Sequence, residues 1–328
     1  MSILVLAHDA VTQLLPMDEC IEVMRDALKA LALGTVYQPL RMVVRPPEAA
    51  GLMVLMPAYR SGESAAFSLK AVCVFPGNTA HGKDAHQGAV LLFDADTGEL
   101  QAVMNASAVT AIRTAAVSGA ATDLLARGDA TDLAIIGAGV QARAHLLAMA
   151  CVRPIRRVRV ASRHFANARK FADEMRFHLL ASIDPCETVE EAVTGADIIV
   201  TATTAREPVL ARGWIKPGAH VNAVGSSIPA AREVDTATVA AASLFVDRRE
   251  STLNESGDYL SAAREGAFGP NHIRAEIGEV LIGAQPGRSS DAEITLFKSL
   301  GLAVEDLAAA AYVYRKAQQA DVGTWIDF

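Results

Sequence analysis

The feature that most constrains the fold is a short apolar run that ends in a glycine turn. Residues 132–136 are followed by Gly137-x-Gly139-x-x-Ala142, and apolar residues then recur at helical spacing. A buried strand that leads through such a turn into a helix is typical of a dinucleotide-binding βαβ unit. Gly137 would allow the tight turn, Gly139 would let the backbone approach a pyrophosphate, and Ala142 would keep the helix close to the strand. The first N–H groups of that helix would face the phosphates.

The segments after this turn continue to alternate between strand and helix. Helices are predicted at 166–175 and 189–193, and strands at 158–162, 197–203, 219–224 and 244–246. This alternation predicts an α/β protein with a doubly wound parallel sheet of the Rossmann type.

The first region of the chain lacks that rhythm. It combines predicted helices at 14–33 and 110–125 with predicted strands at 3–6, 42–44, 52–56, 67–75, 90–93 and 100–104. An alanine-rich helix from 304 to about 318 no longer follows the βαβ pattern, so we expect it to pack on the first region. The expected organisation is a mixed α+β domain of residues 1–125 plus 302–328, into which a Rossmann domain of residues 126–301 is inserted.

Length, composition and charge narrow the class of protein. A chain of 328 residues with 51% hydrophobic and 20% charged residues is globular and long enough for two cores. Its net charge of −7 argues against nucleic acid or an anionic membrane as a partner. No apolar run approaches the ~18 residues of a membrane span. The four cysteines lie far apart without metal-binding spacing, which indicates free thiols and a cytoplasmic protein.

The end of the second Rossmann strand indicates which dinucleotide binds. An acidic residue there would hold the ribose 2′-hydroxyl of NAD, whereas basic residues suit the 2′-phosphate of NADP. This chain has Ser162 and Arg163 at that position, and Arg163 could bind a phosphate with two hydrogen bonds. NADP(H) is therefore favoured, while NAD(H) stays open because Arg163 could instead stack on adenine or lie in solvent.

Three cations of the first region lie in apolar surroundings. Lys70 interrupts an apolar strand, Arg113 interrupts a nearly uncharged helix, and Arg41 precedes a valine strand. Such residues suit a small carboxylate, although each could instead form a structural ion pair. No acidic run lies nearby in sequence to pair with all three. His86 is expected to line the same site as a hydrogen-bonding group, and no metal site is expected.

These residues belong to segments that resemble the ornithine cyclodeaminase/mu-crystallin family. The matching segments span nearly the whole chain in order: 38–41 (Gln-Pro-Leu-Arg), 56–59 (Met-Pro-Ala-Tyr), 69–70, 86–87, 112–116 (Ile-Arg-Thr-Ala-Ala), 137–142, 216–225 (Lys-Pro-Gly-Ala-His-Val-Asn-Ala-Val-Gly), 255–258 and 297–301.

The resemblance implies a homodimer whose substrate domain combines both chain ends. It also implies that Arg41, Lys70 and Arg113 grip a substrate carboxylate beside the nicotinamide. We further predict substrate contacts from Met56 and His86. Cofactor contacts are predicted from Thr114, Gly137, Gly139, Val140, Gln141, Ala142, Ser162, Arg163, Thr203, Val224, Gly225 and Ser226.

One departure within the family separates its chemistries. Cyclodeaminases and related alanine dehydrogenases carry an Asp two residues after the glycine of the Asn-Ala-Val-Gly motif, where this chain has Ser227, as in the ketimine reductase branch. A serine is no general base at neutral pH without a partner. Imine reduction needs only a protonated C=N, a bound carboxylate and an aligned hydride donor, and Lys70 could keep the imine protonated.

We therefore expect an NAD(P)H-dependent oxidoreductase that reduces 2-imino acids to L-amino acids, with Lys70, Arg113 and Ser227 in the catalytic site. The substrate could be cyclic, such as pyrroline- or piperideine-2-carboxylate, or acyclic, such as iminosuccinate, whose second carboxylate could bind Arg232, Lys83 or His86. The alternatives are an ornithine cyclodeaminase with Asp258 as base, an alanine dehydrogenase-like enzyme, and a non-catalytic crystallin-like binding protein.

Overall fold

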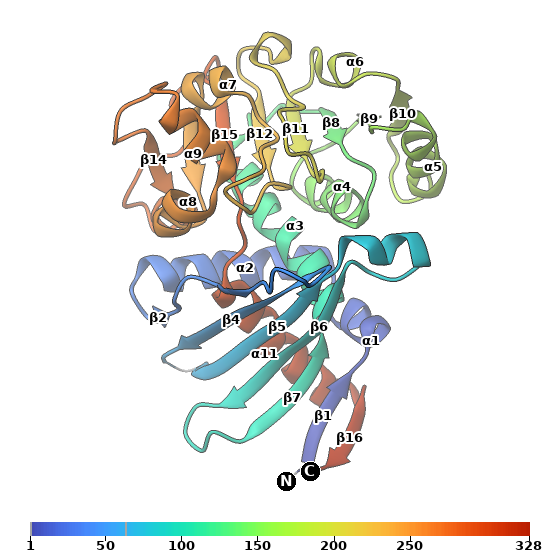
Figure 1. Cartoon of the computed structure of the whole chain (residues 1–328), viewed down its shortest axis with the longest axis vertical. Helices are drawn as coiled ribbons and strands as arrows, with labels where there is room; N and C mark the ends of the chain where they lie inside the picture. Colours follow the sequence, from blue (N-terminus) through green and yellow to red (C-terminus); the bar gives the residue numbers. More distant parts are fainter. Residues whose placement is uncertain (1, 63) are drawn as a thin grey trace. The chain divides into compact units, whose positions relative to one another are not determined.

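The computed structural model describes residues 2–62 and 64–328 and forms two compact units (Figure 1). Unit 1 comprises residues 1–113 and 301–328, and unit 2 comprises residues 114–300. Helix α3 (Ala106–Leu125) begins in unit 1 and ends in unit 2. The domain boundary predicted after residue 125 lies at the end of this helix.

Unit 2 contains an eight-stranded sheet in which every neighbouring pair of strands is parallel. The strand order is β10-β9-β8-β11-β12-β15-β13-β14. The strands are β8 (Asp132–Ile136), β9 (Arg157–Ala161), β10 (Ser182–Cys186), β11 (Ile198–Thr201), β12 (His220–Ala223), β13 (Ser243–Val246), β14 (Ile273–Glu276) and β15 (Thr295–Lys298). This confirms the predicted doubly wound parallel sheet. Its strand order reverses between β8 and β11, the point at which such sheets bind ligands.

Short helices connect these strands, as the predicted alternation requires. They are α4 (Val140–Val152), α5 (Phe165–Met175), α6 (Val189–Val193), α7 (Thr236–Ala241), α8 (Arg249–Glu255), α9 (Gly257–Arg264) and α10 (Ile277–Leu281), with a 3-10 turn at Arg212–Trp214. The four central strands β8, β11, β12 and β15 are almost completely buried, which explains the apolar runs of β8 and β11. Strands β12 and β15 bury polar residues as well: His220, Asn222, Thr295 and Lys298.

Unit 1 contains a mixed sheet in the order β16-β1-β7-β6-β5-β4-β2, with β3 paired to β4. Only the β1–β7 pair is parallel among these strands of the described residues. The strands are β1 (Ser2–Leu6), β2 (Val36–Tyr37), β3 (Met42–Val44), β4 (Leu52–Arg60), β5 (Ala66–Val74), β6 (His86–Asp94), β7 (Leu100–Asn105) and β16 (Thr324–Asp327). The helical segments are α1 (His8–Leu14), α2 (Met17–Ala32), η1 (Pro76–His81) and α11 (Ala303–Ala320).

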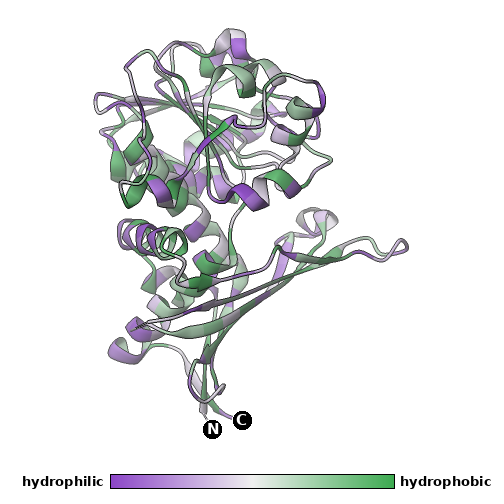
Figure 2. Cartoon of the chain, turned by 90° about the vertical axis from the view of Figure 1, so that its left-hand side faces the viewer, coloured by the Kyte–Doolittle hydropathy of each residue, from purple (hydrophilic) through white to green (hydrophobic). Residues whose placement is uncertain are grey.

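Helix α11 packs on one face of this sheet, against β4, β5 and β6, and α2 packs on α11 (Figure 2). Burial therefore alternates along β5: Ser68, Lys70 and Val72 are buried, whereas Phe67 on the opposite face is 46% exposed. The return of α11 to the first region was expected from the sequence.

Several details differ from the sequence-based expectation. The helix predicted over 14–33 is helix α2, which begins at Met17 with Pro16 as its N-cap, while Leu14 ends the separate helix α1, which was not predicted. Pro16 has no N–H to donate, so a helix does not continue through it. Strand β16 was not predicted; its residues Thr324–Asp327 pair with β1, a partner more than 300 positions away.

Candidate functional site

A buried cluster of opposite charges lies under the sheet of unit 1. Lys70 on β5 and Arg113 on α3 are each 3% exposed, and both contact acidic residues in the first turn of α11. The Lys70 Nζ lies 2.8 Å from the Asp306 Oδ2, and the Arg113 Nε donates to the Asp306 Oδ1 at 2.9 Å. The Arg113 Nη1 donates to the Glu305 Oε2 at 2.6 Å. Asp306 thus bridges the two predicted substrate-binding cations.

Gly301 links Arg41, the third predicted substrate-binding cation, to the cluster of Lys70 and Arg113. The Arg41 Nη2 donates to the Gly301 carbonyl at 3.1 Å. Gly301 has a φ of 78°, and a Cβ there would lie only 2.4 Å from the Arg113 Nη1. A glycine is therefore required for the chain to pass so close to the Arg113 guanidinium.

Glu305 and Asp306 are the residues of this cluster that the sequence analysis missed. Both are fully buried, and they lie 192 and 193 positions from Arg113. The available signal was a pair of acids opening an otherwise alanine-rich helix. The structural ion pairs that the sequence left open are therefore present for Lys70 and Arg113, with acids that lie far away in sequence. Asp306 binds both Lys70 and Arg113, and Glu305 binds Arg113.

The environment shifts the pKa of two residues at this cluster. Burial, with the positive charges of Arg113 and Arg41, lowers the pKa of Lys70 to about 8, against the opposing effect of Asp306. Although His86 is exposed as a whole, partial burial of its ring lowers its pKa, and the charges of Lys70 and Arg113 lower it further. His86 is therefore predominantly neutral at pH 7. Met56 on β4 lies directly opposite Lys70 in the antiparallel register.

The glycine turn of unit 2 has the geometry that a dinucleotide needs. Gly137 adopts a φ of 112°, and a Cβ there would lie 2.4 Å from the Ala202 carbonyl oxygen. Gly139 is the N-cap of α4, and a Cβ built on it would meet no atom within 4 Å. The backbone at Gly139 is thus open to a ligand, and the first N–H groups of α4 have no partner within the helix, an arrangement that suits an anion such as a pyrophosphate. Ala142 is fully buried. The residues present fit a dinucleotide.

The remaining residues predicted to bind cofactor follow the carboxyl ends of neighbouring parallel strands. Ser162 and Arg163 follow β9, and the Gly137 N–H donates to the carbonyl of Ala161, the last residue of β9, at 2.8 Å. Arg163 is exposed. Thr203 follows β11, while Val224, Gly225, Ser226 and the partly exposed Ser227 follow β12. Val140 and Gln141 begin α4, and Thr114 lies on α3 beside Arg113. The fold therefore gathers the unit 2 residues at one edge of its sheet.

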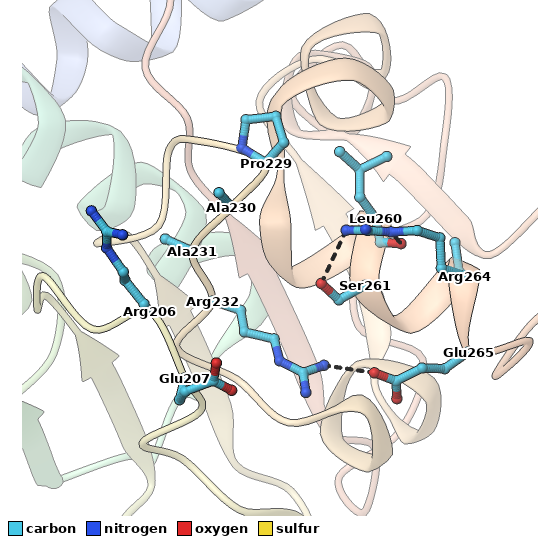
Figure 3. Close-up of a pocket in the computed structure, with 11 residues that line it drawn as sticks. Arg206, Glu207, Pro229, Ala230, Ala231, Arg232, Leu260, Ser261, Arg264 and Glu265 are labelled. Carbon is cyan, nitrogen blue, oxygen red and sulfur yellow. Dashed lines mark hydrogen bonds and ion pairs between the residues drawn. The ribbon is translucent and has the colours of Figure 1, made fainter. Parts of the chain in front are cut away.

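A pocket of about 920 Å³ lies in unit 2 between the loops after β11 and β12 and helix α9 (Figure 3). None of the predicted catalytic or cofactor-binding residues lines it. Arg232, which the sequence analysis considered for a second substrate carboxylate, points to Glu265 and donates to it at 2.9 Å.

Asp258, the base considered for a cyclodeaminase, also has hydrogen-bond and ion-pair partners within unit 2. Its Oδ1 accepts the N–H groups of Glu233 and Val234 at 2.7 and 3.0 Å, and its Oδ2 lies 2.9 Å from the Lys298 Nζ. Within residues 2–62 and 64–328 no group of three His, Cys, Asp or Glu side chains is arranged to hold a metal ion.

Known proteins resemble this chain over nearly its full length. A model of the ornithine cyclodeaminase/mu-crystallin family matches residues 1–321. The mouse (Mus musculus) ketimine reductase mu-crystallin is 44% identical over 281 residues, which cover 86% of this chain and 85% of the relative.

Two solved structures have the same fold. A Delta(1)-pyrroline-2-carboxylate reductase of Thermococcus litoralis, in complex with NADH and L-proline, superposes with a TM-score of 0.95 at 42% identity and covers 98% of this chain and 99% of its own. An archaeal alanine dehydrogenase dimer with bound NAD gives a TM-score of 0.92 at 34% identity and covers 100% of both chains.

Proposed function

Because this chain belongs to the ornithine cyclodeaminase/mu-crystallin family, as its motifs predicted, we propose that it reduces 2-imino acids to L-amino acids with a nicotinamide cofactor. The observation that carries this proposal is the convergence of three cations on one place: Lys70 and Arg113 are buried and share Asp306, and the half-buried Arg41 binds the Gly301 carbonyl beside them. A group of lysine and arginine side chains of this kind suits a small carboxylate substrate. Arg guanidinium groups bind carboxylates with paired hydrogen bonds.

Lys70 is the proposed proton donor. Its pKa of about 8 keeps it predominantly protonated at pH 7 while making the proton easier to give than that of an ordinary lysine. Asp306 holds its ammonium group at 2.8 Å, which fixes the direction from which it would approach the imine nitrogen. A protonated imine is the more electrophilic form.

The bound reduced nicotinamide would supply a hydride to the imine carbon. Hydride addition at carbon and protonation at nitrogen convert the C=N bond into an amine, so the reaction needs no general base. Ser227 occupies the place of the acid that cyclodeaminases carry, and Asp258 is committed to backbone N–H groups and Lys298. Both observations favour reduction over cyclodeamination.

The charges favour cyclic imines with one carboxylate over imino dicarboxylates. His86 is predominantly neutral and Arg232 is paired with Glu265, so neither offers an uncompensated charge to a second carboxylate. Pyrroline-2-carboxylate and piperideine-2-carboxylate are therefore the proposed substrates. Iminosuccinate, for which Lys83 would have to supply the second cation, is the second candidate.

The cofactor preference, assembly and location are further parts of the proposal. The exposed Arg163 after β9, without a nearby acid at the strand end, supports NADP(H) over NAD(H). The apolar open face of the unit 1 sheet, around Phe67, supports a homodimer. All four cysteines are free thiols, which supports a reducing compartment, the cytoplasm. No helix in the described part of the chain is long and apolar enough to span a membrane.

A substrate panel tests the proposed activity. NAD(P)H consumption is followed with pyrroline-2-carboxylate, piperideine-2-carboxylate, and oxaloacetate with ammonia, while L-ornithine with NAD is assayed for proline and ammonia. We expect the cyclic imines to be turned over fastest and ornithine to be inert. Proline formed from ornithine, with no imine reduced, would instead identify a cyclodeaminase. Turnover of neither, with cofactor still bound, would identify a non-catalytic binding protein.

A further inference from the structure

A second buried carboxylate network lies in unit 2 and is not used by the proposed chemistry. Glu233, in the segment between β12 and α7, is fully buried. Its Oε1 accepts the Thr203 N–H at 2.6 Å, and its Oε2 accepts the Gly225 N–H at 2.6 Å and the Thr201 hydroxyl at 2.8 Å. One carboxylate thereby joins the carboxyl ends of the neighbouring parallel strands β11 and β12.

The surrounding chain is built to hold that carboxylate in place. Asp258 at the start of α9 accepts the backbone N–H groups of Glu233 and Val234, and Lys298 at the end of β15 pairs with Asp258. At Gly225 a Cβ would lie 2.5 Å from the Glu233 Oε1 and 2.2 Å from the Thr203 carbonyl oxygen. Only glycine lets the end of β12 approach this closely. Four separate elements therefore fix the position of Glu233.

The position of the network on the sheet indicates which half of a dinucleotide it serves. In a doubly wound sheet the pyrophosphate lies at the first glycine turn, here after β8, and the adenosine ribose lies at the end of the next strand, here β9. The nicotinamide half then lies on the other side of the switch point, over β11 and β12. Thr203 and Gly225, whose N–H groups Glu233 holds, are the predicted cofactor contacts at these two strand ends.

We propose that Glu233 is a positioning residue, which fixes the backbone of Thr203 and Gly225 in the arrangement that receives the nicotinamide half of the cofactor. This inference rests on the proposed function for the identity of the cofactor. Glu233 itself contacts backbone and the Thr201 hydroxyl, so its effect on binding passes through the two strand ends.

The substitution Glu233→Gln tests this directly. Each carboxylate oxygen faces a backbone N–H, so whichever way the glutamine amide turns, its NH₂ group meets the Thr203 or the Gly225 N–H. The variant keeps the volume of the side chain and loses one of the two strand-end contacts. The experiment measures two dissociation constants by calorimetry. The first is the Kd of the complete cofactor, NADH or NADPH, whichever the wild type binds better. The second is the Kd of the matching fragment without nicotinamide, which is ADP-ribose for NADH and its 2′-phosphate form for NADPH.

We expect Glu233→Gln to raise the Kd of the complete cofactor by about tenfold or more, because charge-assisted hydrogen bonds order both strand ends. The Kd of the fragment without nicotinamide should change by less than about twofold. An unchanged Kd for the complete cofactor would overturn the inference. An equal loss for both ligands would also overturn it, since Glu233 would then support the unit as a whole.

The chain offers a matched control and a milder variant. Asp197 accepts the N–H groups of Thr131 and Asp132 at 2.9 and 3.0 Å at the opposite, amino edge of the same sheet. Asp197→Asn keeps an oxygen for both N–H groups and removes the negative charge that pairs with Arg127 and Lys216. It is thus a volume-matched carboxylate-to-amide change in the same unit, and we expect it to leave both Kd values unchanged. If Glu233→Gln does not fold, Thr201→Val is the second variant, because it removes one hydrogen-bond donor to Glu233 with little change of shape. It should raise the Kd of the complete cofactor selectively, by a smaller factor than Glu233→Gln.

The wild type separates this inference from the proposed function. If the wild type binds neither ligand, the proposed cofactor fails, and this inference fails with it. If the wild type binds NAD(P)H and the Glu233 variant binds it equally well, only the inference about Glu233 is overturned.

Discussion

Lys70 is a buried lysine that pairs with Asp306. Asp306 stabilises its protonated form, whereas the positive charges of Arg113 and Arg41 destabilise that form. Its pKa of about 8 means that the protonated form, which the proposed reaction needs, is lost as the pH rises above 8. We predict that kcat/KM for imine reduction falls about tenfold per pH unit above that value. The measurement is a pH profile with pyrroline-2-carboxylate. A profile that stays level to pH 10 would exclude Lys70 as the proton donor.

Replacing Lys70 tests the same role without titration. Lys70→Met keeps the apolar stem and removes the ammonium group, so we predict that kcat falls by about 10²–10⁴-fold while the Kd of NAD(P)H is unchanged. The control is Lys316→Met, which should retain full activity. Lys316 lies on α11, is partly exposed and pairs with Glu19 of α2. Retained activity in Lys70→Met would show that the cluster has been assigned the wrong chemistry.

The sequence predicts the cations of this cluster but not their partners. Lys70 and Arg113 stand out because a charge in an apolar strand or helix must be paired. Glu305 and Asp306 could not be matched to them, since the pairing depends on how α11 packs on the sheet, and nothing local in the sequence encodes that long-range contact. For the same reason the sequence around Glu233 does not indicate the role of this residue. Its role depends on two strand ends that only the folded sheet brings together.

At the scale of elements, the turn into α11 positions Arg113. Gly301→Ala would place a Cβ 2.4 Å from the Arg113 Nη1 at a φ of 78°. We predict that the KM for the imino acid rises at least about tenfold as the guanidinium is displaced. Gly34→Ala is the matched control, because Gly34 has a φ of 74° but no atom within 4 Å of its Cβ position. Equal kinetic effects in both variants would mean that backbone strain alone is responsible.

The strand end after β9 determines the proposed cofactor preference. Arg163→Asp replaces the proposed phosphate ligand with an acid that suits a free ribose hydroxyl. We predict that the ratio of kcat/KM for NADPH to that for NADH falls by at least about tenfold, because a charge-assisted contact is lost and a repulsive one is gained. Steady-state kinetics with each cofactor measures this. An unchanged ratio would place Arg163 outside the cofactor site.

At the scale of the whole molecule, the apolar face of the unit 1 sheet is the proposed dimer interface. Leu69 on β5 lies between Pro57 on β4 and Leu91 on β6, and the exposed Phe67 lies 4.5 Å from Tyr59 between ring centroids. A contiguous apolar face of this kind marks an interface. We predict that Leu69→Glu converts a dimer into a monomer in analytical ultracentrifugation, whereas Leu180→Glu, at an exposed position of unit 2, does not. A monomeric wild type would contradict the proposed assembly.

The fold was more predictable from the sequence than the site. Periodic apolar runs and the Gly137 turn specify the parallel sheet, because each βαβ step is local and has one handedness. The return of the chain end was predicted for α11 but not for β16. Three of the four residues of β16 favour a strand, but so short a segment does not indicate its partner until β1 lies beside it. The break at Pro16 was readable in principle, since proline ends a helix wherever its missing N–H is needed.

In the proposed reaction a hydride passes from the cofactor to the imine carbon. The most direct test supplies NAD(P)H that carries deuterium at both hydrogens of the nicotinamide C4, together with pyrroline-2-carboxylate, and analyses the product by mass spectrometry and NMR. Direct hydride transfer gives L-proline with one deuterium at Cα, and this is the product we expect. Proline without deuterium, or cofactor oxidation without proline, would contradict it.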